Sequence, residues 1–307
     1  HKGGMADSVL DYFGFDASLI PQVLPTFSQQ GRLTGAAAGE VDLPRGIPVT
    51  YRAGDQPNNA FSLNVLKPGE IAAIAGTSGV VYGVSEEIKY DPESRINSFA
   101  HVNHTREQTS LGILLCVNGT GIMNSWLKSN VTPHFSYDQM NHQAARIAVG
   151  SDGLMVFPYG NGAERIFNNR DPGGQIHGLN FNLHSQSHLL RAGQEGIAFS
   201  FRFGIDIMKS MGIRPRVIRA GMANLFLSPV FRDALSNVTD TRIELYNTDG
   251  SHGAARGAGI GAGIYSSYEQ AFRGLKRLSH TEPDPGKQHP YQTAYGQWLE
   301  KLKTLLK

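Results

Sequence analysis

The chain has 307 residues, of which 40% are hydrophobic and 18% are charged, a balance that excludes an intrinsically disordered chain. Its 28 basic and 26 acidic side chains leave a formal net charge of +2, too small to indicate nucleic acid or an anionic membrane as a partner. Cys116 is the only cysteine, which excludes an intrachain disulfide and a cysteine-based zinc site.

The first third of the chain predicts two neighbouring strands joined by a glycine turn. We expect a short helix over Asp7–Phe13 and a short buried strand over Pro48–Tyr51. An apolar run predicts a strand over Ile71–Ala75, a turn at residues 76–79 and a second strand over Val80–Tyr82. The turn between these strands should therefore be exposed.

The rest of the chain predicts units in which a strand, a small-residue turn and a helix follow one another. The expected strands are Gly112–Val117, Val217–Ile218 and Ile243–Tyr246, and the expected helices run through Trp126, over Pro229–Val238 and over Gly250–Gly263. Longer amphipathic helices are expected over His188–Met211 and Pro290–Lys307. The glycines of the helix over Gly250–Gly263 lower its helix propensity, so we expect this helix to pack very closely on a neighbour.

Three of the turns offer backbone N–H groups beside small side chains, at Gly76–Gly79, Gly119–Gly121 and Ala220–Asn224. Such turns bind anions, especially where a helix follows. Their combination, with the hydroxyls of Thr77 and Ser78, favours a nucleotide site, although purely structural turns are the alternative. No P-loop motif is present, and the glycine spacing over Gly257–Gly263 differs from a Rossmann fingerprint.

Two groups of polar residues have both a functional and a structural interpretation. Asp55 follows a glycine at the expected end of a strand, where it could accept a proton from a substrate hydroxyl, or it could cap a helix that begins at Pro57. His184 and His188 are four residues apart, but no H-E-x-x-H motif or third ligand accompanies them, so we predict structural histidines.

Taken in order, the motifs resemble the FGGY family of carbohydrate kinases. Segments that resemble the G-D-Q, G-T-S-G and P-Y-x-x-G-E-R motifs of the family are Ala53–Gln56, Ala75–Gly79 and Pro158–Arg165. A longer resemblance, to the second family signature, is carried by Gly174–Leu179 with His188, Leu189, Ala192 and Glu195. The run Cys116–Gly121 is most similar to the xylulose kinases of this family.

This resemblance implies an α/β, actin-like ATPase (ribonuclease H-like) architecture, in which two lobes close over ATP and a sugar. Residues 1–63 would be the C-terminal end of the first, sugar-binding lobe, and residues 64–307 the second, nucleotide-binding lobe with a C-terminal helix. The implied reaction transfers the γ-phosphate of Mg-ATP to a sugar hydroxyl, with D-xylulose as the first candidate and D-xylulose 5-phosphate as its product.

The resemblance also implies roles for individual residues. Asp55 matches the catalytic base and, with Gln56, the sugar-contacting segment. The residues that match the nucleotide site are Gly76, Thr77, Ser78, Gly121, Ser125, Ala220, Gly221 and Asn224. No metal ligand is carried over, because nothing before Asp55 resembles the D-x-G-T-type residues that hold the metal and phosphates in the family. We therefore expect a fragment that is inactive by itself.

Other functions stay open at this point. Gluconate, glycerol and ribulose are alternative substrates, and a non-catalytic actin-like nucleotide-binding module is an alternative class. We expect a small-molecule sugar as partner, with a homodimer left open. We also expect a cytoplasmic chain, because no apolar run reaches the roughly 20 residues of a membrane span and the first residues lack a signal-peptide pattern.

Overall fold

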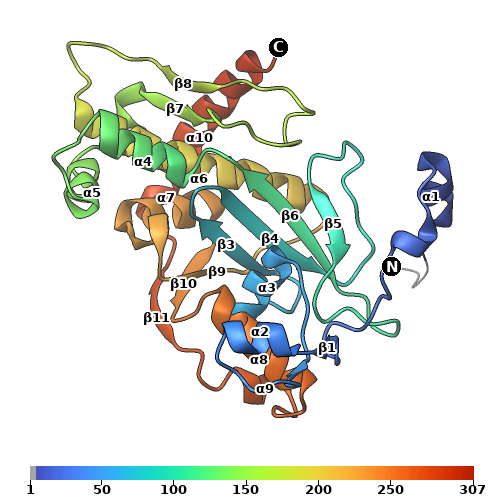
Figure 1. The fold of residues 1–307 in the computed structure, drawn as a ribbon. Helices are drawn as coiled ribbons and strands as arrows, with labels where there is room; N and C mark the ends of the chain where they lie inside the picture. The colour runs from blue at the N-terminus through green and yellow to red at the C-terminus, as the bar shows by residue number, and fades with distance from the viewer. Residues whose placement is uncertain (1–4) are drawn as a thin grey trace.

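The computed structural model describes residues 5–307, which are built around a seven-stranded mixed sheet in the order β11-β10-β9-β3-β4-β6-β5 (Figure 1). Its strands are β3 (Glu70–Ala75), β4 (Gly79–Ser85), β5 (Asn97–Ala100), β6 (Leu111–Val117), β9 (Val217–Gly221), β10 (Arg242–Tyr246) and β11 (Arg277–Thr281). β9 pairs in parallel with β3 and β10, and the other neighbours pair antiparallel.

Helices lie on both faces of this sheet. The helices of residues 5–307 are α1 (Asp7–Phe13), which stands apart from the sheet, and α2 (Gly35–Glu40), α3 (Asp55–Ser62), α4 (Gly121–Asn130), α5 (Tyr137–Ala145), α6 (Gln186–Ser210), α7 (Pro229–Thr239), α8 (Gly250–Gly261), α9 (Tyr268–Ala271) and α10 (Pro285–Leu305). The main core lies where α6, α7 and α10 cover one face, and a smaller core lies where α3 covers part of the other. Across residues 5–307, no helix has both the length and the apolar character needed to cross a membrane.

The strand sequences place side chains on the two faces in alternation. In β4, Val81 belongs to the main core, whereas Val80 and Tyr82 pack on the face that α3 covers. β3 alternates in the same way, with Ala73 in the main core and Ala72 on the α3 side. Because successive side chains of a strand point to opposite faces, an apolar run without alternation builds a sheet that is buried on both sides.

Two hairpin-like pairs stand outside the main sheet: β1 (Gly31–Arg32) with β2 (Pro48–Val49), and β7 (Met155–Pro158) with β8 (Gly174–His177). The prediction of a buried strand over Pro48–Tyr51 is wrong, because β2 ends at Val49 and is exposed. Tyr51 is half-buried by packing rather than by strand pairing, since its ring stacks on Phe27 at 5.4 Å between ring centroids.

The predicted close packing of the glycine-rich helix is confirmed. A Cβ atom on Gly257 would lie 2.6 Å from the ring of Tyr51, and one on Gly261 would lie 1.8 Å from the carbonyl oxygen of Thr50. Thr50 Oγ1 also donates a hydrogen bond of 2.7 Å to the carbonyl of Ala258. The glycines of α8 therefore lower its helix propensity but allow it to contact the chain segment that leads into α3.

Most predicted element positions are confirmed within a few residues, but the C-terminal helix starts earlier than Pro290. It begins at Pro285, because the Asp284 side chain caps it by accepting a 2.9 Å hydrogen bond from the backbone N–H of Gly286. Proline at the first turn of a helix is well tolerated. Pro290 lies inside the helix rather than at its start.

A buried histidine makes the fold sensitive to acid. His101 is 2% exposed, and its Nε2–H donates to the carbonyl of Val65 at 2.9 Å while its Nδ1 accepts from the hydroxyl of Tyr82 at 2.7 Å. Burial lowers the pKa of His101 to about 4. The folded protein therefore holds this imidazole neutral where the unfolded chain, with a pKa of about 6.5, takes up a proton.

We expect the free energy of unfolding to fall by up to about 1.4 kcal/mol per pH unit between about pH 6.5 and about pH 4 because of His101. Urea unfolding at several pH values measures this slope. His101→Gln is the comparison, and its slope should be shallower than that of the wild type over this range. Equal slopes for the two proteins would contradict the assignment of this pH dependence to His101.

Candidate nucleotide and sugar site

A cavity of about 510 Å³ opens beside the turn between β3 and β4. Its walls come from the end of β3, from α4 and α5, and from the segment between β9 and α7, four parts of the chain that are distant in sequence. Five residues that the sequence assigned to a nucleotide site line it: Gly76, Thr77, Gly121, Ser125 and Asn224. The fold therefore brings together two of the three anion-binding turns and the residue that ends the third.

The turn after β3 is held by the start of α4. The backbone N–H of Gly121 donates to the carbonyl of Gly76 at 2.8 Å, and that of Ile122 donates to the carbonyl of Thr77 at 3.3 Å. The hydroxyl of Thr120 also donates to the Gly76 carbonyl, at 3.1 Å. Two of the N–H groups that a helix N-terminus would offer to an anion are thus used to fix the turn.

Asp55 is the first residue of α3, and its carboxylate is exposed. One oxygen accepts a 2.8 Å hydrogen bond from the backbone N–H of Gln56, and the other accepts a 3.1 Å bond from the Gln56 side-chain amide. The alternative that Asp55 caps a helix beginning at Pro57 is wrong, because the helix starts at Asp55 itself and Gly54 occupies the cap position. The carboxylate is oriented by its neighbour and open to a substrate.

Residues 71–264 match the C-terminal domain of the FGGY family of carbohydrate kinases. The chain belongs to this family. It is 26% identical to the xylulose kinase of Bacillus subtilis (strain 168) over 271 residues, which cover 86% of this chain and 52% of that protein. The crystal structure of xylulose kinase from Rhodospirillum rubrum superposes with a TM-score of 0.84 at 26% identity, over 98% of this chain and 60% of that one.

The predicted actin-like ATPase fold of the FGGY kinases is confirmed by these comparisons. A gluconate kinase structure from Lactobacillus acidophilus has a TM-score of 0.86 at 19% identity and covers 98% of this chain and 60% of its own, which shows the shared fold. The chain spans about half the length of the curated relatives that it matches.

Three of the residues that the FGGY resemblance assigned to the nucleotide site lie outside the 510 Å³ cavity. Ser78 is half-buried in the turn, and Ala220 is fully buried within β9. Gly221 lines a smaller adjoining cavity of about 180 Å³, whose wall also includes Asn224. Asn224 has a left-handed backbone (φ 53°) and lines both cavities, so it is the link between them.

Sequence reasoning missed the wall that α5 contributes. Tyr137, Asp138 and Asn141 line the cavity from this helix, with Leu227 and Ser228 from the segment before α7. Ser136 caps α5 in a capping box with Gln139, a local signal that could have placed the helix. Nothing local indicated that this helix would face the turn between β3 and β4.

The Cys116 thiol lies at the end of β6 and is half-buried. Burial raises its pKa to about 12, and the nearby carboxylates of Glu164 and Asp55 act in the same direction. The thiol donates a 3.5 Å hydrogen bond to the side-chain oxygen of Asn118.

Among residues 5–307, no three His, Cys, Asp or Glu side chains form a group that could hold a metal ion. Mg²⁺ is often held by substrate phosphates, water and one or two carboxylates, so single carboxylates such as Asp55 and Asp138 are compatible with it. His184 and His188 both contact Asp152, at 3.2 Å and 3.1 Å, as structural histidines do.

We expect Gly121→Ala to destabilise the protein by about 1–3 kcal/mol and to weaken ADP binding. The added Cβ would lie 2.2 Å from the carbonyl oxygen of Gly76, so either α4 or the turn must move. Urea unfolding and calorimetry with ADP measure the two effects. Gly296→Ala, in α10 with open space around its Cβ position, is the control and should be neutral or slightly stabilising.

Proposed function

We propose that this chain provides the nucleotide site and the catalytic base of an ATP-dependent sugar kinase. One observation carries the proposal: a single cavity unites the β3–β4 turn, the start of α4 and Asn224, while the Asp55 carboxylate lies exposed at the start of α3, whose Asn59 and Ser62 line the adjoining cavity. The family membership supports it. Phosphoryl transfer depends mainly on positioning and charge stabilisation, which such a cleft can supply.

In this proposal each residue has a defined task. Asp55 accepts the proton of the attacking sugar hydroxyl, and Gln56 keeps the carboxylate oriented. The turn at residues 76–78 contacts the phosphates, while Ser125 and Asn224 contact the nucleoside. Mg²⁺ bound with ATP supplies neutralisation of the phosphate charge.

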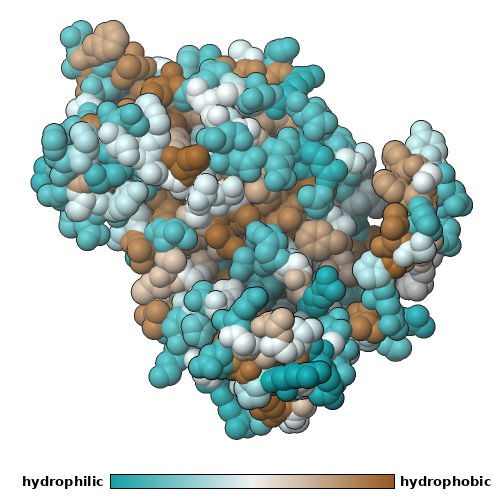
Figure 2. All heavy atoms as spheres, in the orientation of Figure 1, coloured by the Kyte–Doolittle hydropathy of each residue, from teal (hydrophilic) through white to brown (hydrophobic). Residues whose placement is uncertain are grey.

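We propose the same lobe boundary that the sequence indicated, with residues 1–63 ending the sugar-binding lobe and residues 64–307 forming the nucleotide-binding lobe. Apolar side chains gather across the middle of the molecular surface, between α4 and the α3–α8 pair (Figure 2). Half-buried residues on this face of the sheet include Ile74, Leu114 and Cys116. A partly uncovered apolar face suits closure of another lobe over it.

D-xylulose is the substrate that we propose, because several of the similar proteins are named xylulose kinases. Gluconate, glycerol and ribulose are the competing substrates. ADP release by the full-length protein as encoded, measured with each compound in turn, tests the choice. The highest kcat/KM should be found with D-xylulose. A higher value with another of these compounds would replace the substrate, and no turnover with any of them would refute the kinase proposal.

A further inference from the structure

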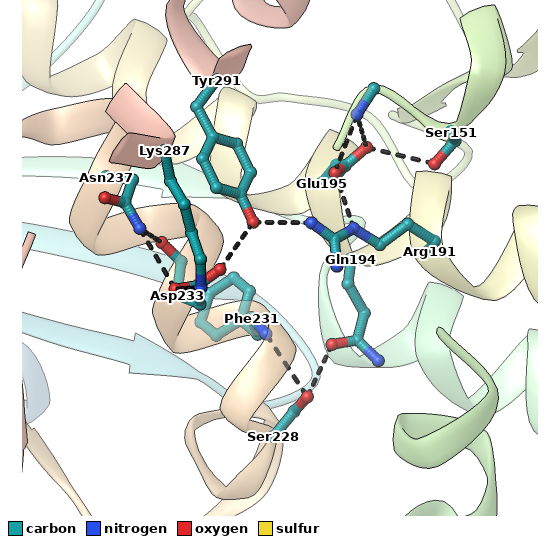
Figure 3. Close-up of polar contacts among 11 residues, drawn as sticks. Ser151, Arg191, Gln194, Glu195, Ser228, Phe231, Asp233, Asn237, Lys287 and Tyr291 are labelled. Atoms are coloured by element: carbon teal, nitrogen blue, oxygen red, sulfur yellow. Dashed lines mark hydrogen bonds and ion pairs between the residues drawn. The ribbon is translucent and has the colours of Figure 1, made fainter. Parts of the chain in front are cut away.

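A buried amide behind the cavity connects two of its walls. Gln194 of α6 is 1% exposed. Its Oε1 accepts a 2.6 Å hydrogen bond from the hydroxyl of Ser228, and its Nε2 donates a 3.0 Å bond to Oδ1 of Asn141. Ser228 and Asn141 both line the cavity, whereas Gln194 does not. Figure 3 shows Gln194 extending from α6 toward Ser228 at the start of α7.

The hydrogen bonds from Ser228 to Gln194 and from Gln194 to Asn141 run in one direction, so that each residue donates to the next. Ser228 caps α7, and its Oγ accepts the backbone N–H of Phe231 at 3.3 Å. Its own hydrogen then needs an acceptor, and Gln194 Oε1 is the one at hand. The amide nitrogen of Gln194 consequently faces Asn141 and occupies its carbonyl oxygen.

This direction of donation determines which polar group of the Asn141 side chain is left for a ligand in the cavity. With Oδ1 occupied by Gln194, the Nδ2 group remains, and it donates to no atom of residues 5–307. Asn141 is half-buried and lines the cavity, so this donor is available to a ligand. The wall from α5 therefore presents a hydrogen-bond donor.

The side of the cavity that α5 and the segment before α7 form together has the features of a site for a nucleobase. The exposed side chains of Tyr137 and Leu227 line this part of the cavity and can cover the faces of a ring. The phosphate-binding turn belongs to a different wall, formed by the end of β3 and the start of α4.

We propose that Gln194 is a positioning residue that orients the Asn141 amide, so that Asn141 Nδ2 donates a hydrogen bond to a ring nitrogen of the purine base. The inference rests on the proposed nucleotide site and adds the means by which this site recognises its base. Asn141 makes the contact, and Gln194 acts only through Asn141 and Ser228.

The test compares ADP with its 1-deaza, 3-deaza and 7-deaza analogues, each of which lacks one ring nitrogen, by calorimetry on the full-length protein. One analogue should bind wild type about fivefold more weakly than ADP, as the loss of one hydrogen bond implies. Asn141→Asp keeps an acceptor for Gln194 but replaces the donor, and it should bind ADP and that analogue with equal affinity. Gln194→Met removes both hydrogen bonds of the amide and should reduce the discrimination.

A control separates positioning from a merely structural role. The hydroxyl of Ser187 in α6 donates to Gln143 of α5 at 3.2 Å, outside the cavity, so Ser187→Ala removes an α5–α6 hydrogen bond without touching the site. It should preserve the discrimination, and thermal unfolding checks that each variant folds. If ADP binds but all three analogues match it, the inference fails while the nucleotide site stands. If ADP does not bind wild type, the proposed function itself fails.

Discussion

Asp55→Asn is expected to lower kcat of the full-length protein by about 10³-fold while leaving ADP affinity within about twofold of wild type. Asparagine has nearly the shape of aspartate but cannot accept the proton of a sugar hydroxyl. Asp55 starts α3, outside the residues that line the cavity proposed to bind the nucleotide, so binding of ADP should persist. A coupled ADP-release assay with D-xylulose measures the turnover, and calorimetry measures the affinity.

The control for this substitution is Asp11→Asn, at an exposed position of α1, the helix that stands apart from the sheet in Figure 1. It should leave both quantities unchanged. Wild-type turnover in Asp55→Asn would remove the catalytic base from the proposal. ADP binding without turnover in any protein, wild type included, would instead favour a non-catalytic nucleotide-binding module.

Arg191→Met is expected to reduce the free energy of unfolding by about 3–5 kcal/mol. Arg191 and Glu195 are 5% and 2% exposed, and their charged groups are 2.7 Å apart. Glu195 also accepts hydrogen bonds from the Gly150 backbone and the Ser151 hydroxyl (Figure 3). Removal of the guanidinium leaves a buried carboxylate without its counter-charge, and urea unfolding measures the loss.

The network extends beyond this pair. Arg191 donates to the hydroxyl of Tyr291 at 2.7 Å, and this hydroxyl donates to Asp233 at 3.0 Å, which joins α6, α10 and α7 (Figure 3). Combining Arg191→Met with Glu195→Leu should destabilise the protein less than Arg191→Met alone, because no unpaired charge remains. A larger loss in the double variant would contradict this account.

The sign of the pH effect in Arg191→Met follows from burial. Burial raises the pKa of Glu195, and the Arg191 charge opposes that rise. Without Arg191 the pKa rises further, so the folded variant holds a proton that the unfolded chain has released. The deficit in the free energy of unfolding of Arg191→Met relative to wild type should therefore be largest near neutral pH and shrink toward about pH 5. A deficit that does not change with pH would indicate that the carboxylate has become solvated.

Local sequence patterns were sufficient to place a helix or strand where the segment itself contains an apolar run or a helical periodicity. The apolar runs of β3, β4 and β6 and the periodicity of α6 placed these elements within a few residues. Short elements without such a signal were missed, among them α2, β5, β8 and β11. β11 and β5 are edge strands that pair on one side only, so they owe their place to a neighbouring strand rather than to their own composition.

The residues of the candidate site also fall into two groups, those that a local motif indicates and those that it does not. The glycine turn at residue 76, Gly121 and Asn224 could be recognised because they belong to motifs of the FGGY family. Tyr137 and Asn141 could not, because their position depends on α5 docking on α6 through contacts such as the one with Gln194, which lies 53 residues away from Asn141. A pattern within a short window contains no information about such a contact.

By itself, the sequence determined the family, the main strands and helices, and the residues that a nucleotide and a sugar are expected to meet. Only the tertiary structure decided that Gly121 serves to bring α4 against the turn between β3 and β4, that Ala220 lies buried in β9, and that α5 forms one wall of the cavity. The physical reason is that motifs reflect the chemistry of local backbone, whereas walls of a cavity are set by packing between segments that are far apart in the chain.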